Sequence, residues 1–125
     1  MRKLGITTAL VSLAAASAPA LAEAGDDIRS AGKCSGSSTS KIKAKARDGV
    51  LEVEFEVDQN RNGVAWKVKI KDNGKVQFRG SARTKGPSGS FSVEKRIADQ
   101  SGTDAIKGVG RNPATGERCV ANVTI

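Results

Sequence analysis

Residues 51–57 read LEVEFEV and residues 64–71 read VAWKVKIK, and these two stretches decide the fold class. Apolar and charged residues alternate in both, which is the pattern of a β-strand with one face in the core and the other in water. Weaker alternation continues over residues 41–46, 76–78, 91–97, 105–109 and 119–125. The pattern predicts seven antiparallel strands and no helix in the mature chain.

Turn residues separate these segments at 72–74, 86–89, 100–102 and 112–116. Seven short strands at this spacing, with Trp66 on the third, predict an all-β, immunoglobulin-like sandwich. We expect this domain to cover residues 41–125. Residues 25–40 are rich in Gly and Ser, which predicts a flexible lead-in that Cys34 attaches to the domain.

The first two stretches also suggest a pairing. If they form a hairpin across residues 58–63, Phe55 lies opposite Trp66 in the core, and Glu54 lies opposite Lys67 on the wet face. Glu52 and Lys69 then face each other in the same way. This register predicts that the glutamates of the second strand neutralise the lysines of the third.

The next connection contains Asn73-Gly74, the usual signal of a two-residue hairpin turn. That register would bury Gln77, so we predict a three-residue loop over residues 72–74 instead. The pairs that this loop implies are Ile70 with Val76, Val68 with Phe78 and Trp66 with Gly80.

The N-terminus has the order of an export signal. Arg2 and Lys3 precede an apolar stretch, and small residues allow cleavage after Ala22 or Ala24. The apolar stretch is shorter and more interrupted than the roughly 20 residues of a membrane span. We therefore expect a signal peptide over residues 1–24, a secreted extracellular protein, and no membrane insertion after cleavage.

Cys34 and Cys119 are the only cysteines in the chain. Disulfides persist in the compartments that exported proteins reach, so we predict a bond between them. The alternative is a pair of free reactive thiols, which the absence of a neighbouring His disfavours.

The chain has 21 basic and 13 acidic residues. Loss of Arg2, Lys3 and Glu23 with the signal leaves 19 and 12, a net charge of +7. This charge favours anionic partners, although a secreted domain also needs charge for solubility.

A run of alternating basic residues is the candidate anion-binding site: Lys41, Lys43, Lys45 and Arg47. Alternate side chains on a strand stand about 6.6 Å apart and could follow a repeating anion. These four have no acidic partner in the predicted register. The alternative is a solvated edge strand that lysines protect from aggregation. All aromatic residues fall on apolar positions, so we expect no stacking platform and no nucleic acid partner.

Catalytic motifs are missing. The chain has no His, which excludes catalysis and metal binding by imidazole, and no nucleophile elbow or phosphate-binding loop is present. Glu52, Glu54 and Glu56 alternate beside lysines, which indicates a salt-bridged surface rather than a glycosidase pair. We predict no enzyme, no catalytic residues and no cofactor.

Residues 58–63 read DQNRNG and match the first half of a calcium loop. The twelfth position of such a loop needs a bidentate Glu, and here it is Lys69, while Arg61 adds a positive charge inside the loop. We therefore predict a strand-connecting turn, no metal site and no dependence on calcium.

Four segments together resemble small exported proteins of actinobacteria. They are KCSGSSTS at 33–40, the run 52–66, PSGSF at 87–91 and GERC at 116–119. The similarity spans nearly all of the mature chain and implies secretion, one sandwich domain and a terminal disulfide. The family has no established activity, so it implies no functional residues.

The function that these features favour is a secreted, non-enzymatic binding module with a basic surface. Its partner would be an anionic cell-wall polymer or an extracellular protein. The alternative is a secreted inhibitor of an extracellular hydrolase, which would present the loop at 84–90 or the loop at 58–63.

Overall fold

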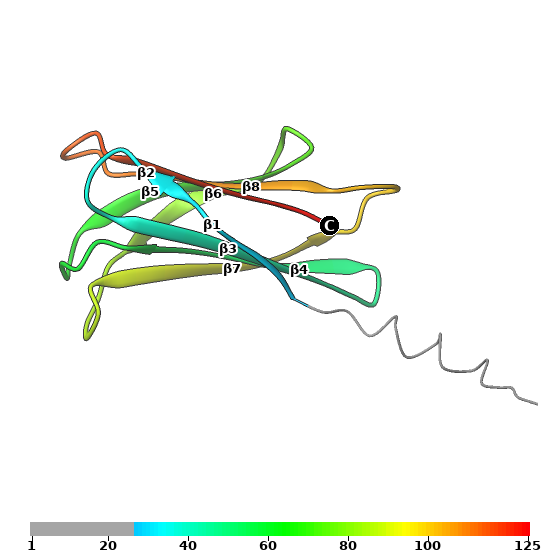
Figure 1. Ribbon diagram of the computed structural model, residues 1–125, viewed down its shortest axis with the longest axis horizontal. Coiled ribbons are helices and arrows are strands. Elements are labelled where there is room, and N and C mark those ends of the chain that lie inside the picture. The colour runs from blue at the N-terminus through cyan, green and yellow to red at the C-terminus, as the bar shows by residue number, and fades with distance from the viewer. Residues whose placement is uncertain (1–26) are drawn as a thin grey trace, which may run out of the picture.

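The computed structural model describes residues 27–125, which form two antiparallel β-sheets packed face to face (Figure 1). The strands are β1 (Ile28–Ala31), β2 (Lys33–Cys34), β3 (Thr39–Arg47), β4 (Val50–Asp58), β5 (Ala65–Asp72), β6 (Lys75–Arg83), β7 (Ser90–Ala98), β8 (Ala105–Arg111) and β9 (Arg118–Thr124). One sheet has the order β1-β3-β4-β7 and the other β2-β9-β8-β5-β6. The predicted all-β class is confirmed. The predicted signal peptide lies outside the described residues.

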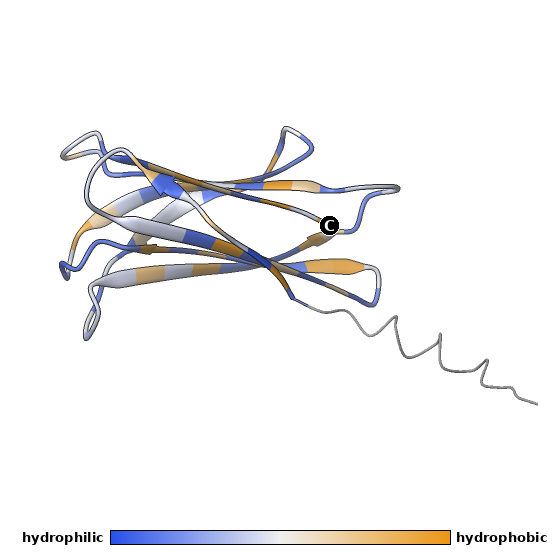
Figure 2. Cartoon of the chain, viewed as in Figure 1, coloured by the Kyte–Doolittle hydropathy of each residue, from blue (hydrophilic) through white to orange (hydrophobic). Residues whose placement is uncertain are grey.

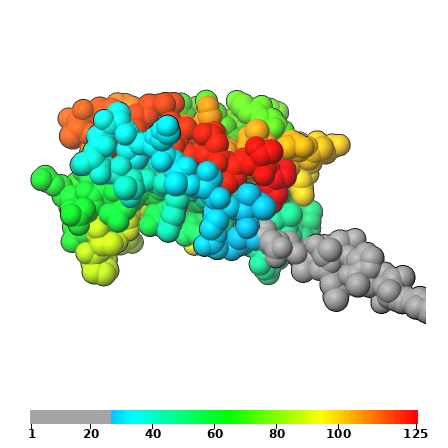
Figure 3. All heavy atoms as spheres, in the orientation of Figure 1, coloured from blue at the N-terminus to red at the C-terminus, as the bar shows by residue number. Residues whose placement is uncertain are grey.

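The prediction of a flexible lead-in before a domain that starts at residue 41 is wrong for residues 28–34 and for residues 39–40, which begin β3. β1 pairs with β3, and β2 pairs with β9, so the described chain has nine strands rather than seven. Gly32 lies between β1 and β2, where its N–H donates to the Ser40 carbonyl at 2.8 Å. Figure 3 shows this segment, in cyan, against the red C-terminal strand. Backbone pairing holds these short strands, and such pairing leaves no mark in an alternation pattern.

The predicted hairpin between residues 51–57 and 64–70 is also wrong. β4 pairs with β3 and β7, whereas β5 pairs with β6 and β8, so the two strands belong to different sheets. Phe55 and Trp66 still both face the core, and Phe91 contacts both rings at centroid distances of 6.4 and 6.0 Å. Alternation tells which face of a strand is buried, but it is equally compatible with partners in either sheet.

The turn between β5 and β6 has two residues, not the predicted three. Asn73 and Gly74 both have positive φ, 51° and 84°, as a two-residue hairpin turn of this kind requires. A bulge shifts the register beyond Ile70, so that Ile70 pairs with Phe78 and Trp66 with Ala82. Because the bulge adds one residue to β6, Phe78 faces inward opposite Ile70. In a regular hairpin with this turn, Phe78 would face outward.

Apolar residues alternate with polar ones along the strands (Figure 2), and the buried apolar residues of both sheets form a single core cluster. Phe55 and Trp66 are fully buried, and the Trp66 indole N–H donates to Gln59 Oε1 at 2.9 Å. Glycines of β8 make room for these rings: a Cβ at Gly108 would lie 2.6 Å from Phe55 Cγ. Close approach of the sheets therefore depends on Gly108.

The predicted disulfide is confirmed. Cys34 and Cys119 are directly paired residues on β2 and β9, so the bond links two neighbouring strands of one sheet. It fastens the N-terminal segment to the last strand.

Candidate functional site

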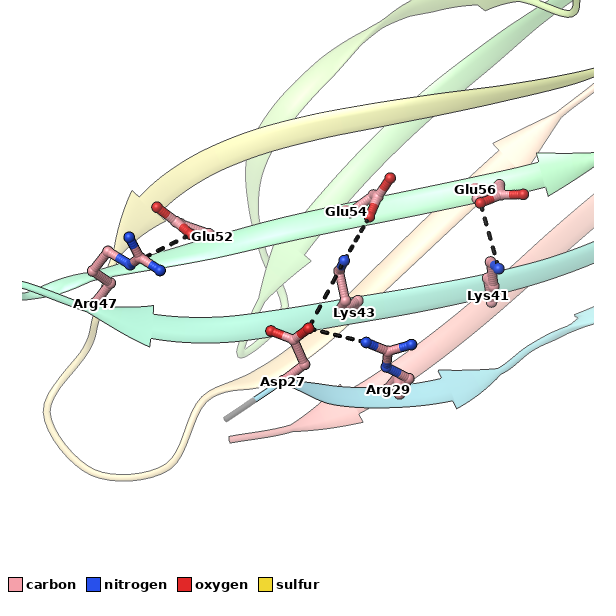
Figure 4. Close-up of polar contacts among 8 residues, drawn as sticks. All are labelled: Asp27, Arg29, Lys41, Lys43, Arg47, Glu52, Glu54 and Glu56. Carbon is pink, nitrogen blue, oxygen red and sulfur yellow. Dashed lines mark hydrogen bonds and ion pairs between the residues drawn. The ribbon is translucent and has the colours of Figure 1, made fainter. Parts of the chain in front are cut away.

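The basic residues that the sequence singled out lie on the outer face of the β1-β3-β4-β7 sheet (Figure 4). Their carboxylate partners come from β4 and from Asp27. The ion pairs are Lys41–Glu56 at 3.7 Å, Lys43–Glu54 at 3.1 Å, Lys43–Asp27 at 3.9 Å and Arg47–Glu52 at 3.9 Å. Lys45 stands opposite Glu52 in the register. The expectation that this set has no acidic partner is therefore wrong.

The edge-strand explanation of the same residues is wrong as well, because β3 lies between β1 and β4. Exposed ion pairs of this kind add little stability, about 0 to 1 kcal/mol each. Their consequence is electrostatic. A polyanion approaching β3 would meet carboxylates interleaved with the lysines, so this face is a poor anion site.

Unpaired positive charge gathers instead on the outer face of the other sheet. Lys67, Lys69 and Lys71 point outward from β5, and their cross-strand partners on β6 and β8 include further basic residues. We call this surface the cationic face; its basic side chains are Lys33, Lys67, Lys69, Lys71, Arg79, Arg83, Lys107, Arg111 and Arg118. Within residues 27–125, no Asp or Glu occupies an outward position of these strands, and no residue of the cationic face forms an ion pair.

A groove of about 560 Å³ lies in the cationic face. Its lining consists of Lys67, Val68, Lys69, Lys71, Arg79, Gly80, Ser81, Val109, Arg111 and Arg118. Val109 points outward, yet only 8% of it is exposed. Long basic side chains can cover an apolar residue with their stems while their charged ends stay in water. The groove therefore has an apolar floor and cationic walls.

Sequence reasoning missed this site because it paired the glutamates with the wrong lysines. The predicted register places Glu52 and Glu54 opposite Lys69 and Lys67. In the structure, these glutamates form ion pairs with basic residues of β3. The glutamates of residues 52–56 can neutralise only one of the two lysine runs. The excess of basic residues was the signal that the other run must remain unpaired.

The calcium-like stretch at residues 58–63 connects the two sheets. Asp58 Oδ1 accepts a hydrogen bond from the Asn60 N–H at 2.9 Å, and Asn60 has a positive φ of 58°. The predicted strand-connecting turn is confirmed.

Cys34, Glu117 and Cys119 place ligand atoms within 4.8 Å of one another. The two sulfurs are bonded to each other, and Glu117 accepts hydrogen bonds from the N–H and Oγ of Ser38 at 3.0 and 2.9 Å. This cluster is structural.

A second group of carboxylates was not anticipated. Asp72 at the end of β5 and Asp104 before β8 are 2% and 1% exposed, and Asp99 lies on the connecting loop. Burial, and then the neighbouring Asp104 carboxyl group, raise the pKa of Asp72 from 3.8 to about 6. Hydrogen bonding with Asp104 also raises the pKa of Asp99.

These shifts predict a pH-dependent stability. Folding raises the pKa of the Asp72 carboxyl group, so its contribution to the free energy of unfolding is fully present below pH 3.8. That contribution is lost as the pH rises through about 6. The charged groups around Asp72 are Asp99, Asp104 and its cross-strand neighbour Lys75. In a buffer with a chelator, we expect the Tm of the wild type to fall between pH 5 and pH 7.5. Asp72→Asn should remove much of this fall, and identical pH profiles for both proteins would contradict the assignment.

The part of the chain that the structure describes has no helix long and apolar enough to cross a membrane. No known protein family, no curated protein and no solved structure matches this chain.

Proposed function

We propose that this protein is a secreted, non-enzymatic binding module whose cationic face holds an extended phosphate-bearing polymer of the cell wall. The observation that carries the proposal is the charge of that face: all its charged side chains are basic, and none is neutralised by an ion pair among residues 27–125. Such a surface attracts polyanions by releasing their counterions.

The geometry supports an extended ligand rather than a compact one. Alternate residues on β5 stand about 6.6 Å apart, and neighbouring strands lie about 4.8 Å apart, so the basic side chains form a two-dimensional array. The groove runs through this array with Val109 as its floor. A flexible chain with repeating phosphates could contact several of these side chains at once.

A cell-wall polymer is favoured over a nucleic acid because the cationic face carries no aromatic ring among the described residues. Trp66, Phe55 and Phe91 are in the core, and Phe78 faces inward, where Lys95 Nζ lies 4.5 Å from its ring centroid. Single-stranded nucleic acids usually bind through bases stacked on exposed aromatic side chains.

We also propose that the sandwich is immunoglobulin-like. Counting from β3, the first, second and fifth strands share one sheet, and the other four form the second sheet in the order β9-β8-β5-β6. Immunoglobulin domains likewise have their first, second and fifth strands in one sheet, the third, sixth and seventh in the other, and a buried Trp on the third, which supports the proposal. The fourth strand differs from the constant-type arrangement, because β6 pairs with β5. The disulfide departs from the antibody pattern because it links β2 and β9 within one sheet.

The test compares two triple variants with the same change of net charge. One replaces Lys67, Lys69 and Lys71 by Gln on the cationic face, and the other replaces Lys41, Lys43 and Lys45 by Gln on β3. Binding to purified teichoic acid is measured by calorimetry at low and physiological salt.

We expect the first variant to bind at least about tenfold more weakly at low salt, with a salt slope reduced by about 2, because three phosphate contacts are lost. The second variant should bind almost as the wild type, since its lysines already face carboxylates. Equal binding by all three proteins would contradict the proposal. Tighter binding to single-stranded DNA than to teichoic acid would show that the ligand of the cationic face is a nucleic acid and not a cell-wall polymer.

One observation favours the alternative of a hydrolase inhibitor. The two candidate loops are joined into a single ridge: Gly63 N–H donates to the Thr84 carbonyl at 2.7 Å, and Gln59 N–H donates to the Gly89 carbonyl at 3.0 Å. Thr84 Oγ1 also donates to the Arg61 carbonyl at 2.6 Å. Residues 60–63 and 85–88 remain exposed at its tip. A rigid exposed ridge loses little entropy on entering an active site.

The inhibitor alternative predicts saturable inhibition of a secreted hydrolase. The test screens a panel of extracellular proteases and glycosidases with the intact protein, and then with an Asn62→Ala, Ser88→Ala variant. Inhibition that the variant loses, while the lysine variants retain it, would favour this function over polymer binding.

A further inference from the structure

We propose that Asp72, Asp104 and Asp99 form a binding site for a hard divalent cation, Ca²⁺ in the first place, where the end of β5 meets the loop between β7 and β8. The prediction of no metal site rested on the missing His and on the run at 58–63, neither of which includes these aspartates. Asp72 is distant in the chain from Asp99 and Asp104, and the pairing of β5 with β8 brings it beside Asp104.

The first argument is a buried carboxylate without a donor. Asp72 is 2% exposed, and neither of its carboxylate oxygens has a hydrogen-bond partner among residues 27–125. Lys75 stands opposite Asp72 in the register but forms no ion pair with it. A carboxylate in this position needs either a proton or a cation, because buried charge without a partner is strongly unfavourable.

The second argument is that another buried carboxylate shares the site. Asp104 is 1% exposed and lies two residues before Ile106, the cross-strand partner of Asp72, so both carboxyl groups lie on the inner face at the same end of the sheet. One of its oxygens accepts a hydrogen bond from the Gln100 N–H at 3.2 Å. Two adjacent buried carboxylates repel each other when both are charged, and a divalent cation between them would remove that repulsion.

The surrounding backbone holds these groups in place. The Asn73 side chain accepts from the Ala105 N–H at 2.9 Å and donates to the Thr103 carbonyl at 3.2 Å, which ties the β5–β6 turn to the loop before β8. Asp104 and Ile125 exchange two backbone hydrogen bonds of 2.7 and 2.9 Å. Asp72 and Asp104 are therefore presented on rigid elements.

Asp99 supplies the mobile ligand. The three carboxylates are not all within 4.8 Å of one another as they stand, so binding requires the exposed Asp99 side chain to turn towards the buried pair. Ca²⁺ tolerates irregular sites of 6 to 8 oxygens, whereas Mg²⁺ demands a near-ideal octahedron. An all-oxygen site without His or free Cys also disfavours Zn²⁺. Water would complete the coordination.

The experiment measures Tm and calorimetric binding for the mature, disulfide-bonded protein at pH 7.5, in a chelator and then with increasing CaCl₂. We expect a Kd of about 10⁻⁴ to 10⁻³ M, as in other extracellular calcium modules. At saturation, Tm should rise by about 5 °C. Asp72→Asn should abolish the response to calcium, and the matched control Asp58→Ala, in the calcium-like turn, should retain it.

Asp99 is exposed, so a substitution there does not disturb the core and gives a second variant that still folds. Asp99→Asn should weaken calcium binding about tenfold, the loss of one charged ligand. The site would be overturned if calcium produced neither heat nor a Tm shift up to 10 mM, about ten times the weakest affinity expected. An unchanged calcium response in Asp72→Asn would overturn it equally, and the buried pair would then hold only a shared proton.

Discussion

Loss of the Cys34–Cys119 bond should lower the free energy of unfolding by up to about 4.5 kcal/mol. The two cysteines are 85 residues apart, so the bond closes a loop that takes in most of the described chain. In the chain-entropy model, a loop of this length restricts the unfolded state strongly. A domain of about 100 residues has only about 5 to 15 kcal/mol of stability in total, so the bond decides whether the fold persists at 37 °C.

The measurement is urea unfolding of the oxidised wild type and of a Cys34→Ala, Cys119→Ala double variant. The variant avoids free thiols, and Ala is small enough for the buried position of Cys119. Wild type with a reductant serves as the control for the substitution itself. A difference below about 1 kcal/mol would show that β2 and β9 are held mainly by their own pairing.

A second large effect is expected at Gly108, where Ala should destabilise the fold by about 3 kcal/mol. A Cβ there would lie 2.6 Å from Phe55 Cγ, and both residues are buried between the sheets. Neither can move aside without displacing its strand, because Phe55 packs against Phe91 and Gly108 pairs with Ile70 and Ala121.

Gly110→Ala is the matched control, since the nearest atoms to its added Cβ are at 3.4 Å. Gly110→Ala should lower the free energy of unfolding by less than about 1 kcal/mol. In a Gly108→Ala background, replacing the Phe55 ring by the smaller Leu side chain should recover part of the lost free energy of unfolding. The effects of substitutions at contacting residues are not additive. Equal costs for the two glycines would show that the sheets can separate freely at this point.

The polymer and calcium experiments examine different parts of the molecule. The lysines of the groove lie on the outer face of the β2-β9-β8-β5-β6 sheet, whereas Asp72 is buried at one end of it. A protein that binds calcium but no polymer, or polymer but no calcium, would therefore separate the two proposals.

Local chemistry was enough to predict part of this protein. The sequence alone determined the all-β class, the buried side of most long strands and the positions of the turns, because alternation and turn residues act within a few positions. It also determined the disulfide, since only Cys34 and Cys119 can form one in this chain.

Tertiary structure alone decided which strands pair and therefore which charges cancel. The same alternation would let the glutamates of β4 form ion pairs with the lysines of β3 or with those of β5. Because β4 and β5 belong to different sheets, the glutamates pair with β3 and the lysines of the cationic face stay without carboxylate partners. Asp72 and Asp104 likewise come together only through the pairing of β5 with β8, without any motif. The physical reason is that side-chain periodicity records burial, whereas pairing depends on backbone hydrogen bonds and core packing between segments distant in the chain.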